Sequence, residues 1–157
     1  MKRFLNILLT FLFLLMVMNM SGCSDGRLKT EHVSGIITLD GVPLADATVG
    51  FGPKVAGQGA VGFARTNEKG EYILQAMNGR PDAGTLPGEY AVTVAKYKLV
   101  PTGRKETDPY TRKVTDEMTS VFLFPEMKTY ADAETTPFSA TVVKGKNTFD
   151  FDIKSKP

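Results

Sequence analysis

Short runs of alternating apolar and polar residues make up most of the chain after residue 30, and turn-forming residues separate these runs. Within 89–97, Tyr90, Val92 and Val94 alternate with Ala and Thr, which is the period of a strand with one buried face. The alternation predicts strands at 33–39, 47–51, 61–66, 71–76, 89–97, 138–142 and 149–153, with an eighth if 119–124 also pairs. Seven to eight short strands joined by turns predict an all-β fold, an antiparallel β-sandwich.

Three tight turns are predicted between these strands. An Asp-Gly pair closes the first hairpin, because both residues tolerate a positive φ. In the second turn an asparagine amide caps the chain and a glycine takes a positive φ, and in the third a Pro-Gly pair opens strand 89–97. The turn residues are Asp40 and Gly41, Asn67 and Gly70, and Pro87 and Gly88.

The segment 98–118 does not continue the alternation. It holds five basic and four acidic residues, and Pro101 and Pro109 interrupt it. Such a segment is predicted to be a long, mobile, solvated loop. With the Gly-bearing loops Gly52–Gly59 and Met77–Leu86, it is where we expect contacts with other molecules.

The first 22 residues have the pattern of an export signal. Two basic residues precede an apolar run over 4–18, which is shorter than the ~20 residues of a membrane-spanning helix. The small residues Ser21 and Gly22 follow, directly before Cys23. We therefore expect an exported protein whose signal ends before this cysteine.

The string Met20-Ser21-Gly22-Cys23 resembles the lipobox of bacterial lipoproteins, with Met20 in place of the usual leucine. The resemblance implies cleavage between Gly22 and Cys23, diacylglycerol on the Cys23 thiol, and acylation of the new amino group by a fatty acid such as palmitate. Two or more acyl chains anchor a protein stably. The expected location is the cell envelope, and Ser24 after the cysteine favours the outer membrane where an organism has two membranes.

These observations divide the chain into three parts. Residues 1–22 are the expected lipoprotein signal peptide, and 23–30 are the lipidated cysteine with a polar tether. Residues 31–155 are the expected β-sandwich domain, with the mobile loop at 98–118. The tether spans at most about 25 Å, so we expect the domain close to the membrane.

Composition excludes several classes of function. Without Lys2 and Arg3 of the signal, the 19 basic residues become 17 and equal the 17 acidic ones, so the mature chain lacks the excess of cations that binds nucleic acid. Cys23 is the one cysteine and His32 the one histidine. Neither an internal disulfide nor a Cys-based zinc site can form.

The turns occur in an order that resembles a known family. Val33-Ser34-Gly35 and Asp40-Gly41-Val42-Pro43-Leu44 look like the opening of carboxypeptidase regulatory-like domains, which are transthyretin-like β-sandwiches. Thr66–Tyr72 resembles the family's Thr-Asp-x-x-Gly-x-Phe/Tyr turn, with Asn67 for Asp, and Pro87-Gly88-Glu89-Tyr90 resembles its Pro-Gly-x-Tyr strand. The resemblance covers nearly all of 33–153 and implies a fold rather than a function.

Candidate chemistry is sparse. Asp150 and Asp152 share the outer face of the last strand about 6–7 Å apart, a spacing that suits a carboxylate pair or a calcium site, although a solvated face is the expected reading. Tyr90 is expected in the core, with a sugar contact as the second reading. His32 has no second imidazole to work with, and the chain does not match the transthyretin-like 5-hydroxyisourate hydrolases, which need further histidines and a Tyr-Arg-Gly-Ser end. No catalytic residue, metal site or cofactor is expected.

The sequence thus predicts a non-catalytic, lipid-anchored envelope protein whose β-sandwich is a binding or scaffold module. Its expected partners are the membrane, through Cys23, and an unknown envelope protein or polysaccharide. A carbohydrate-binding module and a subunit of an envelope protein assembly are the two alternatives.

Overall fold

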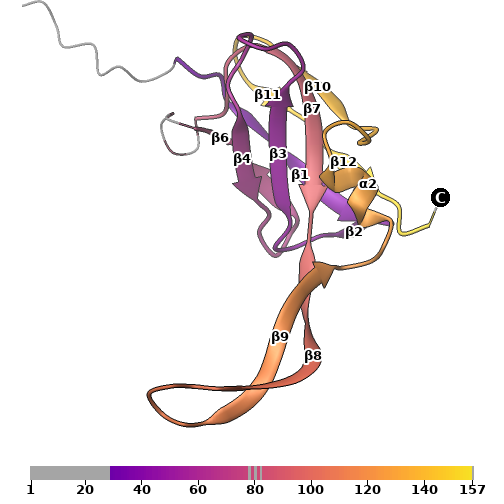
Figure 1. Cartoon of the computed structure of the whole chain (residues 1–157). Coiled ribbons are helices and arrows are strands. Elements are labelled where there is room, and N and C mark those ends of the chain that lie inside the picture. Colours follow the sequence, from indigo (N-terminus) through magenta and orange to yellow (C-terminus); the bar gives the residue numbers. More distant parts are fainter. Residues whose placement is uncertain (1–28, 78, 80, 82, 157) are drawn as a thin grey trace, which may run out of the picture.

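The computed structural model describes residues 29–77, 79, 81 and 83–156, and this part of the chain is an all-β structure with one short helix (Figure 1). Two five-stranded sheets form the body, and a two-stranded sheet extends from it. The predicted all-β class is confirmed. In this part there are twelve strands rather than seven or eight. The predicted strand 71–76 is divided in two, and three strands were not predicted, namely Val42–Pro43, Tyr97–Thr107 and Asn147–Thr148.

The first sheet surrounds β1 (Val33–Leu39). Antiparallel to it run β2 (Val42–Pro43) and β5 (Glu71–Ile73). The strands β11 (Asn147–Thr148) and β12 (Phe151–Ile153) pair with β1 in parallel. The predicted antiparallel pairing does not hold for these two pairs, since the end of the chain returns beside its first strand in the same direction.

The second sheet has the strand order β10, β7, β3, β4, β6, and every pair in it is antiparallel. The longest of its strands is β7 (Gly88–Ala95), which pairs with β10 (Ser139–Val142) on one side and β3 (Thr48–Pro53) on the other. Beyond β3 lie β4 (Gly62–Arg65) and β6 (Gln75–Ala76).

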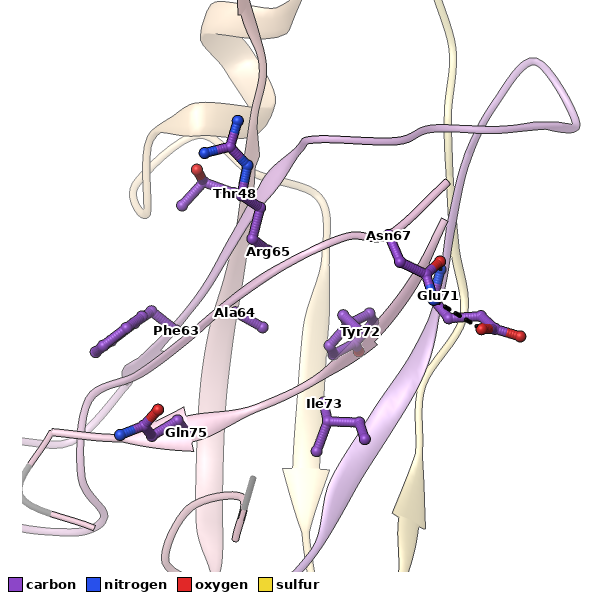
Figure 2. Close-up of a pocket in the computed structure, with 9 residues that line it drawn as sticks. All are labelled: Thr48, Phe63, Ala64, Arg65, Asn67, Glu71, Tyr72, Ile73 and Gln75. Atoms are coloured by element: carbon purple, nitrogen blue, oxygen red, sulfur yellow. Dashed lines mark hydrogen bonds between the residues drawn. The ribbon is translucent and has the colours of Figure 1, made fainter. Parts of the chain in front are cut away.

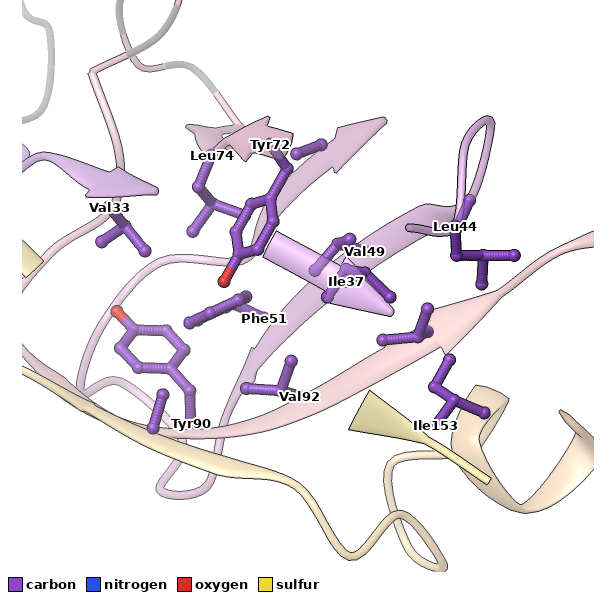
Figure 3. Packing of buried hydrophobic residues seen from close by; sticks show 14 of the residues in the cluster. Val33, Ile37, Leu44, Val49, Phe51, Tyr72, Leu74, Tyr90, Val92 and Ile153 are labelled. Atoms are coloured by element: carbon purple, nitrogen blue, oxygen red, sulfur yellow. The ribbon is translucent and has the colours of Figure 1, made fainter. Parts of the chain in front are cut away.

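A single hydrophobic core joins the two sheets (Figure 3). Phe51 of β3 lies at its centre, with ring centroids 6.4 Å from Tyr72, 5.8 Å from Tyr90 and 6.2 Å from Phe149. Each fully buried side chain of this size stabilises the fold by roughly 1.5–3 kcal/mol. Of the residues that the alternation predicts to face inward, Leu39, Phe149 and Phe151 are half-buried against this core. The others are buried, namely Val33, Ile37, Ala47, Val49, Phe51, Tyr72, Leu74, Tyr90, Val92, Val94 and Ile153.

The predicted loop 98–118 is a β-hairpin instead. β8 (Tyr97–Thr107) and β9 (Val114–Phe122) pair antiparallel and extend away from the body, and we call residues 97–122 the arm (Figure 1). Pro101 lies where the register shifts before Lys105, so the ladder accommodates a residue that would interrupt a regular strand. The charges that suggest a solvated loop lie instead along an exposed ribbon.

Several contacts fix the base of the arm. The Lys96 N–H donates to Met127 Sδ at 2.9 Å, and its carbonyl accepts from Leu123 N at 2.9 Å. The Lys96 ammonium donates to the Ala45 carbonyl at 2.7 Å. Met127 is fully buried and begins α2 (Met127–Ala131), a helix that the sequence pattern does not predict. The arm therefore leaves the body in a defined direction.

The start of the described chain and the arm lie at opposite ends of the body. Figure 1 shows residues 29–31 near one end of the two large sheets, while β8 and β9 extend from the other. No helix of the described part is long and apolar enough to cross a membrane.

Candidate functional site

One face of the arm is apolar and uncovered. Residues directly opposite in an antiparallel pair point to the same side, so the register gives the members of each face. What we call the Leu99 face begins with the pairs Tyr97–Phe122, Leu99–Ser120 and Pro101–Met118 and continues with Lys105–Asp116 and Thr107–Val114. Leu99 is 66% exposed, Tyr97 53% and Met118 47%.

One ion pair and one side-chain hydrogen bond connect the two strands of the arm. The Lys105 ammonium lies 2.5 Å from Asp116 Oδ1 on the Leu99 face, so the two charges of that face neutralise each other. On the opposite face, which carries Lys98, the Thr102 hydroxyl donates to Glu117 Oε2 at 2.6 Å. The ribbon is therefore amphipathic, and an antiparallel sheet of this kind normally packs its apolar face on something.

The tip of the arm is an ordered turn. Asp108 Oδ1 accepts from Thr111 N at 2.7 Å and from Tyr110 N at 2.8 Å, and these backbone hydrogen bonds lower the pKa of its carboxyl. Tyr110 is 94% exposed. A two-stranded ribbon alone is marginally stable in water. The stacked rings of Tyr97 and Phe122, 4.8 Å apart, support the ribbon near its base.

A groove of about 520 Å³ lies between β4 and β5, where the edges of the two large sheets meet (Figure 2). Phe63 and Ile73 are each about half exposed along it. Arg65 and Gln75 add polar groups, and the Arg65 guanidinium lies 3.3 Å from Asp46 with both side chains mostly exposed. A flat aromatic ring beside planar polar groups suits a sugar or an extended peptide.

The predicted Asp40-Gly41 turn is confirmed, with φ values of 52° and 81°. Asp152 joins the last strand to it, because Asp152 Oδ1 accepts from Thr38 Oγ1 at 2.7 Å and from Gly41 N at 2.9 Å. Hydrogen bonds from Lys154, Thr38 and Gly41 lower the pKa of Asp152 to about 2. This carboxylate is a structural acceptor.

Asp150 has a similar role on the same outer face. Asp150 lies between β11 and β12, and its Oδ1 accepts from Ile36 N of β1 at 2.8 Å. The two aspartates, exposed as predicted, thus hydrogen-bond different points of β1. Among the described residues, no group of three or more His, Cys, Asp or Glu side chains could hold a metal ion.

The predicted roles of Asn67 and Gly70 are confirmed. Asn67 Oδ1 accepts from Lys69 N at 2.9 Å and from Glu71 N at 3.0 Å, and its amide donates to Glu71 Oε2 at 2.8 Å. Gly70 has a φ of 74°, and a Cβ there would lie 2.4 Å from the Ile37 carbonyl oxygen. Only glycine suits both the turn and the close approach to β1.

Tyr90 belongs to the core, as predicted, and the alternative reading as a sugar contact is wrong. The side chain is fully buried. Its hydroxyl donates to the Leu86 carbonyl at 2.6 Å and accepts from Ala60 N at 3.2 Å, with Thr85 Oγ1 also 3.2 Å away. These bonds join the loop after β3 to the start of β7, which begins at Gly88 directly after Pro87.

The backbone at Phe149 passes directly against Gly35, and the sequence pattern did not predict this contact. A Cβ on Gly35 would lie 1.8 Å from the Phe149 carbonyl oxygen, which also accepts from the Tyr72 hydroxyl at 2.8 Å. Burial, with a smaller contribution from the charge of Asp150, raises the pKa of that hydroxyl. A glycine inside a predicted strand is the one signal that could have indicated this close approach.

Gly22 and Cys23 lie outside the described residues, whereas His32 precedes β1 and its carbonyl accepts from Asn147 N at 2.9 Å. The arm and the groove are thus two surfaces of the described part that carry uncovered apolar side chains. No family model, curated protein or solved structure matches the chain.

Proposed function

We propose that this protein is a non-catalytic, lipid-anchored component of a bacterial cell envelope, and that its β-sheet body presents the arm as a binding surface. The anchor rests on the string Met20-Ser21-Gly22-Cys23, which implies lipid on Cys23. An outer-membrane location is favoured by Ser24. The two sheets around one core support the transthyretin-like, carboxypeptidase regulatory-like assignment, with the arm as an addition to it.

The observation that carries the proposal is the uncovered Leu99 face. A lipid on Cys23 would hold the end of the body near residue 29 at the membrane, and the arm extends from the other end (Figure 1). At ~3.3 Å per residue, its 11-residue strand is at most about 35 Å long. An apolar surface on the side of the body that faces away from the membrane suits contact with another envelope component.

The test is fractionation and in-cell cross-linking of the full chain. Wild type should enter the membrane fraction, and Cys23→Ser should be unprocessed or leave that fraction. Cross-links should concentrate on the arm, and Leu99→Asp should abolish them, while Lys98→Asp on the opposite face is the matched control. Cross-links that are insensitive to Leu99→Asp, or a Cys23→Ser chain that is processed and sediments like wild type, would refute the proposal.

The groove supports carbohydrate binding as a second candidate. Phe63 offers a half-exposed ring, and Arg65 and Gln75 offer hydrogen-bond donors beside it. Retention of the chain on immobilised envelope polysaccharide should fall when Phe63 becomes alanine. It should stay the same for Val55→Ala, an exposed apolar residue outside the groove. Equal retention of the two variants would exclude the groove as the binding surface.

A further inference from the structure

We propose that the Leu99 face is an interface between two copies of this chain, whose arms pack face to face and point in the same direction. This deepens the proposed binding role and uses its anchored orientation. The register of the arm makes its apolar face complementary to itself under a two-fold rotation.

The arrangement has a two-fold axis that runs along the arms and between their faces. Such a rotation places β8 of one copy over β9 of the other at the same height. Each residue of the Leu99 face then lies over the residue with which it pairs in its own chain. Two aligned sheets pack in this way at a separation of about 10 Å.

Size and charge agree along the whole face. Leu99 of one copy lies over Ser120 of the other, so that a large side chain faces a small one. Lys105 lies over Asp116, so that the ion pair within each arm becomes a cluster of four alternating charges. The other three pairs also match in type. Tyr97 of one copy lies over Phe122 of the other, Pro101 over Met118, and Thr107 over Val114.

The anchor is compatible with this arrangement. Two copies held in one membrane by their N-terminal ends present their arms in the same direction. A stack with opposed arms would turn the N-terminal end of one copy away from the membrane. The axis along the arms is the two-fold arrangement that keeps both anchors on the same side.

The area of contact indicates a weak interface. Nine residues of β9 at ~3.3 Å each, on a ribbon about 10 Å wide, give a footprint on the order of 300 Å² per copy. A standard stable interface uses about 800 Å² per partner. Confinement in one membrane raises the effective concentration of the second copy, so pairing is expected at the membrane.

The experiment uses two differently tagged full-length copies expressed together, cross-linked in whole cells, and purified through one tag. The second tag should be recovered with wild type and with Lys98→Asp. Leu99→Asp should reduce recovery by about tenfold or more, because it places an unpaired carboxylate in the contact. Undiminished recovery with Leu99→Asp, or recovery of a different protein in place of the second copy, would overturn the inference.

A charge exchange distinguishes pairing from misfolding. In a pair of Lys105→Asp chains, the carboxylates at 105 and 116 of one copy face the carboxylates at 116 and 105 of the other. In a pair of Asp116→Lys chains, ammonium groups face each other in the same way. Each variant should fail to recover its own copy, whereas the two expressed together should recover one another. Equal recovery in all combinations would contradict the proposed rotation.

Fractionation of the same cells separates this inference from the proposed anchor. A wild-type chain found in the soluble fraction that still forms a Leu99-sensitive pair would refute the anchor and support the interface. An anchored chain that forms no such pair would support the anchor and overturn the interface. A soluble chain without the pair would overturn both.

Discussion

Replacing Gly35 with alanine should strongly destabilise the protein. The new Cβ would lie 1.8 Å from the Phe149 carbonyl oxygen and 2.6 Å from the Phe149 carbonyl carbon. These are backbone atoms, so no rotamer change relieves the clash. The return of the chain from β11 to β12 has to move away from β1 by more than an ångström to reach ordinary contact.

Two costs determine the magnitude. Overpacking in a well-packed region costs typically 1–3 kcal/mol. The displaced Phe149 carbonyl also loses its hydrogen bond from the buried Tyr72 hydroxyl, and a buried donor without a partner costs about 1–3 kcal/mol. The free energy of unfolding should therefore fall by about 3–5 kcal/mol, a large part of the ~5–15 kcal/mol typical of a folded domain.

Urea denaturation followed by circular dichroism measures this change, since the chain has no tryptophan. With a slope of roughly 2 kcal/mol per molar urea, the midpoint should move down by about 2 M. Gly52→Ala is the matched control, because its nearest heavy atom would lie 4.0 Å from the new Cβ. A loss below about 1 kcal/mol for Gly35→Ala would refute the reasoning. In that background Tyr72→Phe should cost less than it does in wild type, since the hydrogen bond is already broken.

Three further changes test other contacts. The pKa of Asp152 is lowered to about 2 in the folded state, so its contribution to stability is present above about pH 4 and is lost as the pH falls towards 2. In Asp152→Asn the melting temperature should therefore decrease less between about pH 4 and pH 2 than it does in wild type. An equal decrease in the two proteins would contradict this. Tyr90→Phe should lower the free energy of unfolding by about 1–3 kcal/mol in urea denaturation, because the Leu86 carbonyl and the Ala60 N–H lose their hydrogen-bond partner. An unchanged free energy of unfolding would contradict the role of these hydrogen bonds. Lys96→Met removes the ammonium bond to the Ala45 carbonyl and should speed proteolytic cleavage at the base of the arm several-fold, whereas Lys98→Met should not; equal rates would contradict the role of this contact.

The strands of the body could be predicted because their alternation reports burial directly. Val49 and Phe51, or Val92 and Val94, share a face by period alone, and the structure buries them. The pairing of β1 with β11 and β12 could not be predicted in this way. Parallel pairing joins residues more than 110 positions apart and leaves no local signal.

The candidate site was predicted less well than the body. The segment that forms the arm was predicted to be a loop because its charges and prolines obscure the alternation of Tyr97 and Leu99. Lys105 and Asp116 face each other across the ladder, which is visible only once the register is known. The turn residues Asn67 and Gly70 were predictable because their chemistry acts within a few positions of the chain.

The continuity of β7 and β8 has a mechanical consequence. Lys96 alone separates β7, an interior strand of the body, from the first strand of the arm, so tension applied at the arm enters the body along β7. Ladders on both sides of β7 would resist that pull in shear, with their hydrogen bonds loaded together rather than broken one after another. A chain held at its N-terminal end and pulled at the arm would therefore transmit force through a strand that is paired on both sides.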